Sequence, residues 1–175
     1  MIIGLTGKAR SGKDTVALYL SKQHNFNHYW FSKPMKDACK VIFGWDDRQL
    51  YGALKEVIDP VYKVSPRVAL QTLGTEWGRN CISSDLWLNR AKAEILKHEN
   101  ITISDCRFDN EAQMILGMGG YIIEVIRPDT KEVAAHSSEE GITPGLINFT
   151  IDNKGTLSDL YKLVDYLLIN KEAEY

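Results

Sequence analysis

The chain has 175 residues, a formal net charge of −2 and three cysteines. This length fits one domain with a substantial core, and the charge gives no electrostatic argument for a nucleic-acid or a membrane surface. No apolar stretch approaches the ~20 residues of a membrane span, and an odd number of cysteines without metal-ligand spacing argues against a disulfide framework or a zinc site. We therefore expect a cytoplasmic protein with small-molecule partners that binds neither nucleic acid nor membranes.

The amino-terminal segment combines an apolar run with a glycine-rich loop. Residues 1–6 have the length and character of a buried strand, and residues 7–15 read Gly-Lys-Ala-Arg-Ser-Gly-Lys-Asp-Thr. In a G-x-x-x-x-G-K segment the backbone N–H groups point at an anion, and the lysine reaches the β and γ phosphates of a nucleotide. The strict motif continues with Ser or Thr, which holds Mg²⁺, whereas here Asp14 comes next and Thr15 follows. The loop predicts a nucleotide site with Asp14 or Thr15 as the metal ligand.

Hydrophobic periodicity and capping residues predict the regular elements. Strands are expected over residues 1–6, 28–31, 101–104, 121–126 and 147–151, and helices over residues 13–23, 34–44, 65–79, 85–98, 109–118 and from residue 156 onward. Strands that alternate with helices are typical of a parallel sheet covered on both faces. We predict a single α/β domain, residues 1–175, with the three-layer P-loop NTPase fold and a five-stranded parallel sheet.

Two stretches depart from this alternation. Residues from about 45 to 100 are predicted to be a helical insertion, and within it residues 45–64 lack a clean period and read as a short helix and loops. Residues 129–146 are polar, glycine-rich and long for an unstructured connection, which favours a mobile lid.

The helix that ends at Gly44 is expected to bury an apolar stripe, which consists of Met35, Ala38, Val41 and Ile42.

Charged residues gather after the predicted strand at residues 101–104. Asp105 follows this strand directly, and Arg107 and Glu111 lie just beyond it. Ligands of open α/β sheets bind at the carboxyl ends of the strands, so chemistry is expected here. Asp105 is interpreted as a metal or water-shell ligand or as a partner of Arg107, with a solvated loop aspartate as the alternative.

Arginines at helix starts, strand ends and loops suit a protein that holds two phosphate groups end to end, because the planar guanidinium matches phosphate oxygens. The set consists of Arg10, Arg67, Arg79, Arg107 and Arg127, of which Arg79 is better explained by a surface ion pair.

An acceptor that is itself a phosphate is largely ionised at neutral pH and needs no general base. None of the four histidines lies at the end of a predicted strand, where a base would be placed, although His136 could still act in the lid. Catalysis would then reduce to alignment and charge neutralisation.

Segments spread over most of the chain resemble, in the same order, the deoxynucleoside monophosphate kinases of bacteriophages. They are Gly7 to Thr15, Ala69-Leu70-Gln71-Thr72-Leu73-Gly74-Thr75-Glu76, Trp87, Ser104-Asp105-Cys106-Arg107-Phe108-Asp109-Asn110-Glu111, Val125-Ile126-Arg127-Pro128, His136, Glu139 and Ile151-Asp152-Asn153-Lys154-Gly155. The Leu-Gly-Thr, Asp-x-Arg-x-Asp-x-Glu and Gly-Lys-Asp-Thr elements are much more specific than the phosphate loop alone. Residues 45–64 match the family poorly.

The resemblance implies transfer of the γ-phosphoryl group of ATP to a deoxynucleoside 5′-monophosphate, with Mg²⁺, in the host cytoplasm if the chain is phage-encoded. The implied ATP site consists of Gly7, Ala9, Arg10, Ser11, Gly12, Lys13, Asp14, Thr15 and Asn153, with Asp14 and Thr15 as metal ligands. The implied monophosphate site consists of Arg67, Gln71, Gly74, Thr75, Trp87, Asp105, Arg107 and Glu111. The implied catalytic residues are Lys13, Arg10, Arg107, Arg127 and Asp105.

Several alternatives stay open at this point. Trp87 could stack on a base or belong to the core. The chain could be a P-loop kinase for another small acceptor, of the dephospho-coenzyme A or phosphomevalonate type. A hydroxyl acceptor would call for a base, and Asp105 is the only plausible one. A non-catalytic nucleotide-binding regulatory protein is the rival from another class, and the sequence is also compatible with a homodimer.

Overall fold

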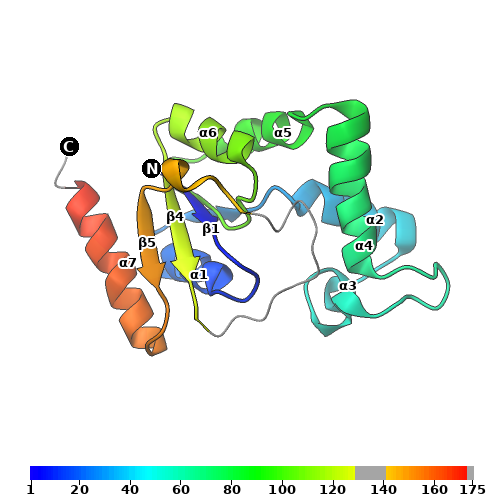
Figure 1. Ribbon diagram of the computed structural model, residues 1–175, viewed down its shortest axis with the longest axis horizontal. Helices are drawn as coiled ribbons and strands as arrows, with labels where there is room; N and C mark the ends of the chain where they lie inside the picture. Colours follow the sequence, from blue (N-terminus) through cyan, green and yellow to red (C-terminus); the bar gives the residue numbers. More distant parts are fainter. Residues whose placement is uncertain (129–140, 173–175) are drawn as a thin grey trace. The chain divides into compact units, whose positions relative to one another are not determined.

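The computed structural model describes residues 1–128 and 141–172, and the side chains up to residue 169. Most of the predicted lid, residues 129–140, lies outside the described residues. The chain divides into two compact units, each taken by itself below. The sheet unit comprises residues 1–30 and 94–175, and the helical unit comprises residues 31–93 (Figure 1). The helical unit therefore begins before residue 45, where the insertion was expected to start.

The sheet unit is built on five parallel strands in the order β2-β3-β1-β4-β5. The strands are β1 (Ile2–Thr6), β2 (Asn27–Tyr29), β3 (Ile101–Ile103), β4 (Tyr121–Ile126) and β5 (Phe149–Asp152). The predicted five-stranded parallel sheet is confirmed, although β2 and β5 are shifted by one or two residues. Because β1 lies at the centre, the loop after it is flanked by the carboxyl ends of β3 and β4.

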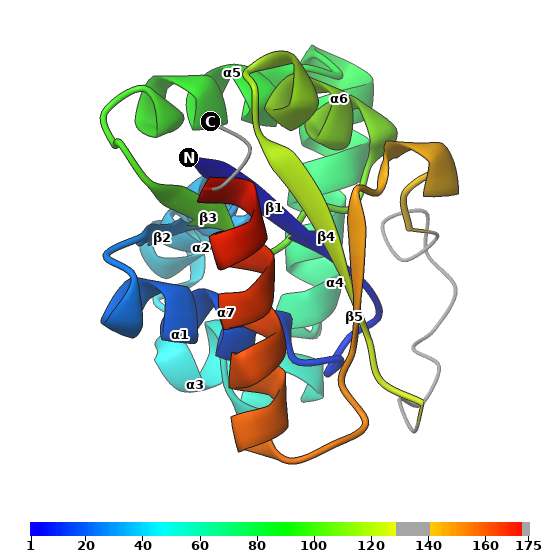
Figure 2. The ribbon, with the colours of Figure 1, turned by 90° about the vertical axis from the view of Figure 1, so that its left-hand side faces the viewer.

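Helices cover both faces of this sheet (Figure 2). On one face, α1 (Lys13–Gln23) and α7 (Leu157–Glu172) share a core with β1, β4 and β5 that includes Leu5, Leu20 and Val164. On the other face, α6 (Asp109–Gly117) places Ile115 so near Gly4 that a Cβ there would lie 2.8 Å from the Ile115 Cδ1 atom. Burial of each large aliphatic side chain contributes ~1.5–3 kcal/mol, so both layers fix β1 and the loop after it.

The start of α7 shows a reciprocal cap between Thr156 and Asp159, which have the three-residue spacing of a capping box. The Thr156 amide donates to the Asp159 Oδ2 atom at 2.9 Å, and the Asp159 amide donates to the Thr156 hydroxyl oxygen at 3.2 Å. This arrangement satisfies two amide donors that would otherwise lack a partner at the helix start.

A short 3₁₀ helix, η4 (Pro144–Leu146), precedes β5. Within the described part of the chain, no helix has both the length and the apolar character needed to cross a bilayer.

The helical unit contains short helical elements and loops. In chain order they are α2 (Lys33–Phe43), α3 (Asp47–Leu50), η1 (Ala53–Glu56), α4 (Pro66–Gln71) and η2 (Thr72–Ile82), and α5 (Leu86–Ile95) runs across the boundary into the sheet unit. Ser65, directly before Pro66, caps α4 by accepting from the Val68 amide at 3.4 Å. The expectation of a short helix and loops over residues 45–64 is confirmed.

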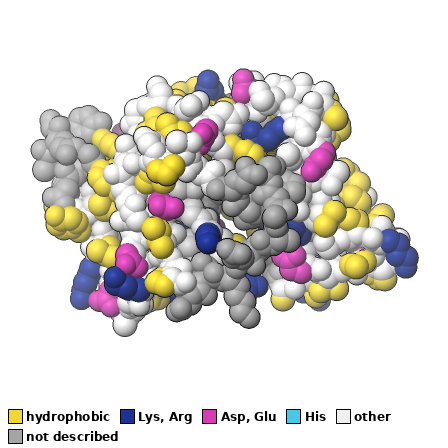
Figure 3. Space-filling view, in the orientation of Figure 1, with side chains coloured by type: hydrophobic (Ala, Val, Ile, Leu, Met, Phe, Trp, Pro, Cys, Tyr) yellow, Lys and Arg dark blue, Asp and Glu magenta, His cyan; other side chains and the backbone are white. Residues whose placement is uncertain are grey.

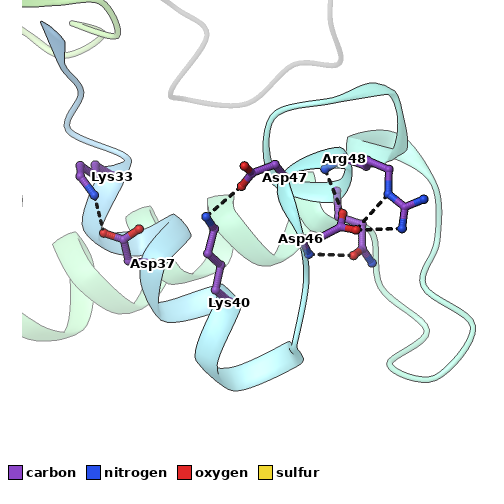
Figure 4. Close-up of polar contacts among 7 residues, drawn as sticks. Lys33, Asp37, Lys40, Asp46, Asp47 and Arg48 are labelled. Atoms are coloured by element: carbon purple, nitrogen blue, oxygen red, sulfur yellow. Dashed lines mark hydrogen bonds and ion pairs between the residues drawn. The ribbon is translucent and has the colours of Figure 1, made fainter.

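Polar contacts organise the loop region of the helical unit. Asp59 accepts from the Trp45 indole at 2.8 Å and from two backbone amides, Val61 and Tyr62. The Tyr62 amide and then the Trp45 indole lower the pKa of the Asp59 carboxyl group. Figure 4 shows a set of ion pairs in the same unit: Lys33 with Asp37, Lys40 with Asp47, and Arg48 with Asp46. Exposed pairs of this kind contribute little to stability, so Asp59 is the stronger anchor of the loop.

Two predictions for the helical unit are wrong. The apolar stripe of α2 does not include Val41 and Ile42, which are 87% and 58% exposed. The helix instead buries Met35 and Cys39, which lie one turn apart on the same face. Val41 and Ile42 are therefore exposed apolar side chains. Figure 3 draws the hydrophobic side chains of one face of the protein in yellow.

The second wrong prediction is a continuous α-helix over residues 65–79. The α-helical part ends at Gln71, and Thr72–Ile82 form a π-helix, η2. Two of its glycines permit close packing within the helical unit: a Cβ on Gly74 would lie 2.6 Å from the Met35 Sδ atom of α2, and one on Gly78 would lie 2.6 Å from the Trp87 ring of α5. The 3.6-residue period predicted for this segment therefore does not hold beyond Gln71.

Candidate active site

The glycine-rich loop after β1 has the backbone that an anion cradle requires. Gly7 and Gly12 have φ angles of 125° and 112°, which side chains of L-residues rarely allow. A Cβ on Gly7 would also lie 2.3 Å from the Val125 carbonyl oxygen. Arg10, in the middle of the loop, has a φ angle of 64°. The two glycines thus let the loop turn back tightly on itself before α1 begins.

The inside of the loop carries a cation and a hydroxyl group. The Lys13 ammonium donates to the carbonyl oxygens of Gly7 and Lys8, both at 2.7 Å, and only 9% of Lys13 is exposed. The Ser11 hydroxyl is buried and has no hydrogen-bond partner among the described residues. A buried hydroxyl group without a partner is unfavourable, and a phosphate oxygen would satisfy it. The loop is therefore built to surround an anion.

A pocket of about 380 Å³ opens beside this loop. It is lined by Arg10, Gly12, Lys13, Asp14, Thr15, Arg127, Asn153, Gly155, Leu157 and Leu160. Arg127 reaches it from the end of β4 and Asn153 from the end of β5. The Asn153 amide donates to the Ser11 carbonyl oxygen at 2.8 Å, so Asn153 also fixes the loop. The structure thus brings six residues of the predicted nucleotide site, together with Arg127, to one pocket.

Asp14 lies in the first turn of α1, beside the carboxyl end of β3. Its side chain is exposed, and its Oδ1 atom accepts from the Ser104 hydroxyl at 3.1 Å. The Ser104 Oγ atom in turn lies 2.7 Å from His28 Nε2. Sequence reasoning missed both His28 and Ser104, although each lies on or just after a predicted strand.

The loop between β3 and α6 presents Asp105 and Arg107. Its backbone is anchored by the Cys106 amide, which donates to the Leu5 carbonyl oxygen at 3.1 Å. Glu111 is 2% exposed, and its Oε2 atom accepts from the amides of Arg107 at 2.7 Å and Phe108 at 3.1 Å. This geometry favours a supporting role for Glu111 behind the loop, while its predicted contact with a substrate stays a prediction.

The remaining predicted substrate residues belong to the helical unit. Arg67 pairs with Glu56 of η1, and Gln71 and Thr75 flank the point where α4 gives way to η2. Trp87 is buried, and its indole donates to the Gly74 carbonyl oxygen at 2.8 Å. For Trp87 the structure supports the core alternative, because the indole N–H donates to Gly74 and the ring packs against Gly78 within the helical unit.

Comparison with known proteins identifies the family. The family model for deoxynucleotide monophosphate kinase matches residues 47–164. A protein of Acanthamoeba polyphaga mimivirus whose name assigns it to the same kinases is 33% identical, with 79% of this chain and 80% of that protein covered. The chain belongs to the deoxynucleotide monophosphate kinase family.

A second relative agrees with this family, and two solved structures share the fold. The deoxynucleoside-5′-monophosphate kinase of Escherichia phage T5 is 26% identical, with 99% of this chain and 98% of that protein covered. Shikimate kinase from Aquifex aeolicus superposes with a TM-score of 0.52 at 14% identity, covering 99% of each chain. The protein TT1252 from Thermus thermophilus superposes with a TM-score of 0.51 at 15% identity, covering 97% of each chain. These two structures support the predicted three-layer fold and nothing beyond it.

Members of a kinase family use a nucleotide co-substrate, and the loop pocket offers suitable donors for one. The described residues contain no group of three or more His, Cys, Asp or Glu that could enclose a metal ion. Mg²⁺ at a nucleotide site needs no such cage, because it is usually held by one or two carboxylates, phosphate oxygens and water. The oxygens of Asp14 and Thr15, beside Lys13 in the pocket, fit this pattern of hard ligands.

Proposed function

We propose that the protein transfers the γ-phosphoryl group of ATP to a deoxynucleoside 5′-monophosphate and so forms the diphosphate. One observation carries this proposal: a chain of the deoxynucleotide monophosphate kinase family has a loop pocket in which Lys13, Arg10 and Arg127 converge. Three cationic side chains around one pocket suit a reaction in which charge spreads over the oxygens of the transferring phosphoryl group. The proposed compartment is the cytoplasm, which is that of the host if the chain is phage-encoded.

On the donor side, the loop from Gly7 to Thr15 binds the phosphates of ATP. Lys13 exchanges its two carbonyl acceptors for phosphate oxygens, and the Ser11 hydroxyl gains the partner that it lacks among the described residues. Asp14 and Thr15 would hold Mg²⁺, which would supply neutralisation of phosphate charge at this site. Arg127 contributes positive charge from the end of β4.

On the acceptor side, no general base is needed. The monophosphate is largely dianionic at neutral pH and can attack without losing a proton. Arg107 binds and orients its phosphate, while Asp105 orders water or Arg107 beside it. In the helical unit, Arg67, Gln71, Gly74 and Thr75 form the proposed monophosphate-binding set. Trp87 supports Gly74 through its hydrogen bond and contributes to this set indirectly.

The acceptor class is tested by an ADP-release assay with all ribo- and deoxyribonucleoside monophosphates. Dephospho-coenzyme A and phosphomevalonate serve as the rival acceptors, and a reaction without acceptor measures ATP hydrolysis. We expect release of ADP that depends on a deoxynucleoside monophosphate. ADP release with one of the rival acceptors alone would overturn the proposed substrate, and nucleotide binding without any acceptor-dependent turnover would favour the regulatory alternative.

A further inference from the structure

Three side chains of the sheet unit, from β2, from the residue that follows β3 and from α1, form a continuous row of polar contacts that ends at the nucleotide loop. His28 Nε2 on β2 lies 2.7 Å from the Ser104 Oγ atom, and this hydroxyl group lies 3.1 Å from the Asp14 Oδ1 atom on α1. Ser104 is 3% exposed, whereas Asp14 is exposed. These polar contacts therefore lead from a half-buried imidazole, through a buried hydroxyl group, to an exposed carboxylate in the first turn of α1.

The chemistry of the groups sets the direction of these hydrogen bonds. An ionised carboxylate can only accept, so the single hydroxyl proton of Ser104 goes to Asp14. The Ser104 oxygen must then accept, which requires a proton on Nε2 of His28. His28 thus donates to Ser104 and Ser104 donates to Asp14, so the loss of either donor changes what the carboxylate contacts.

The pairing of β2 with β3 and the Trp30 ring hold His28 and Ser104 in place. The strands β2 and β3 pair in parallel, and the Ser104 amide donates to the Tyr29 carbonyl oxygen at 3.2 Å. The His28 ring packs against the Trp30 ring with a centroid distance of 4.6 Å. Because both donors are fixed by the sheet and its neighbours, they can select one orientation of an exposed side chain that would otherwise sample several rotamers.

We propose that His28 and Ser104 are positioning residues, which orient the Asp14 carboxylate so that its second oxygen is available to Mg²⁺ at the nucleotide phosphates. This inference rests on the proposed function. A Ser or Thr directly after the lysine presents its hydroxyl group on a short side chain, whereas an aspartate has one more rotatable bond and benefits from an external support. Partners of metal ligands commonly supply such support, and their loss weakens metal binding about 10–100-fold.

The test measures Mn²⁺ affinity of the protein–ADP complex by electron paramagnetic resonance, alongside the Mg²⁺ dependence of turnover. Ser104→Ala is expected to weaken Mn²⁺ binding by about tenfold while the affinity for ADP in EDTA stays at the wild-type value. Ser104→Thr, which keeps the hydroxyl group, restores most of the affinity. His28→Gln, which keeps a donor at similar reach, binds Mn²⁺ more tightly than His28→Leu.

Thr102→Val is the matched control. Thr102 lies on β3, is fully buried, and its hydroxyl group has no hydrogen-bond partner among the described residues. Thr102 lies opposite His28 in the β2–β3 register, but its hydroxyl group makes no hydrogen bond to His28 or Ser104, so its removal should leave Mn²⁺ affinity unchanged. A loss equal to that of Ser104→Ala would overturn the proposal in favour of a general effect on the sheet.

A double-mutant cycle with Asp14→Asn separates positioning from an independent effect. We expect Ser104→Ala to have almost no further effect on Mn²⁺ affinity when Asp14 is already replaced. Additive losses, or wild-type affinity in both Ser104→Ala and His28→Leu, would contradict the proposal. If the wild-type protein phosphorylates no monophosphate, the proposed function fails, whereas the Mn²⁺ titrations still decide the role of His28 and Ser104.

Discussion

At the scale of single residues, Asp14 is where this chain departs from the strict phosphate-loop motif. We predict that Asp14→Asn raises the Mg²⁺ concentration for half-maximal rate on the order of tenfold, because a neutral amide is a weaker ligand for a hard cation. Thr15→Val should have a smaller effect. The measurement is the rate as a function of Mg²⁺ at saturating nucleotides, and the opposite order of effects would assign the metal to Thr15.

Arg67 is the residue whose predicted role and observed contact differ most. It was expected to bind the monophosphate, and it pairs with Glu56 within the helical unit. We predict that Arg67→Ala weakens binding of the deoxynucleoside monophosphate by ~1.5–3 kcal/mol, the usual contribution of a hydrogen bond to a charged group. Affinity for ATP should hardly change, and Arg67→Lys should restore only part of the loss because an ammonium lacks the two-pronged geometry.

Titration calorimetry of each nucleotide measures these effects, with Glu56→Gln as the control. This variant removes the ion pair but leaves the guanidinium, so it should bind the monophosphate at least as well as the wild type. If Glu56→Gln loses as much affinity as Arg67→Ala, the pair has a structural role and Arg67 does not contact the acceptor.

At the scale of elements, Asp109 at the start of α6 binds Thr143 in the segment that precedes β5. Its carboxylate accepts from the Thr143 hydroxyl group at 2.6 Å and from the Thr143 amide at 2.8 Å. The hydroxyl group and then the amide lower the pKa of Asp109. A carboxyl group whose pKa is lower in the folded state stabilises the fold above its unfolded pKa, about 3.9, and this stabilisation is lost as the pH falls through the folded value.

We therefore predict that Asp109→Asn lowers the melting temperature at pH 7, and that the difference from the wild type shrinks below about pH 4. Thermal unfolding at a series of pH values between 3 and 7 measures this difference. A difference that is constant with pH would mean that the charge of Asp109 contributes nothing to the contact with Thr143.

The elements also show why some features could be predicted and others could not. The phosphate loop and the Thr156–Asp159 cap depend on residues within a few positions of each other, so their sequence spacing was sufficient. The π-helix η2 could not be predicted, because its apolar residues recur at α-helical spacing, and the contacts of Gly74 with Met35 and of Gly78 with Trp87 join separate elements. The contact of His28 with Ser104 joins residues 76 positions apart, and only the pairing of β2 with β3 brings them together.

At the scale of the whole molecule, the five parallel strands of the sheet were predicted more fully than their order or the site. Alternating strands and helices indicated a parallel sheet, and the parallel sheet places the ends of β1, β3, β4 and β5 at one edge. That edge explains why Asn153 and Arg127 meet the loop although both are more than 100 residues away from it. The contribution of the helical unit to the acceptor site stays a prediction that rests on the family resemblance.

The most direct test of the central claim follows the phosphoryl group itself. The protein is incubated with ATP labelled in the γ-phosphate, Mg²⁺ and a deoxynucleoside monophosphate, and the products are separated by chromatography. We predict that the label appears in the β-phosphate of the deoxynucleoside diphosphate, and that Lys13→Ala, which removes the cation from inside the loop, abolishes this product while the fold remains intact. Label found only in inorganic phosphate, or equal transfer by Lys13→Ala, would contradict the account.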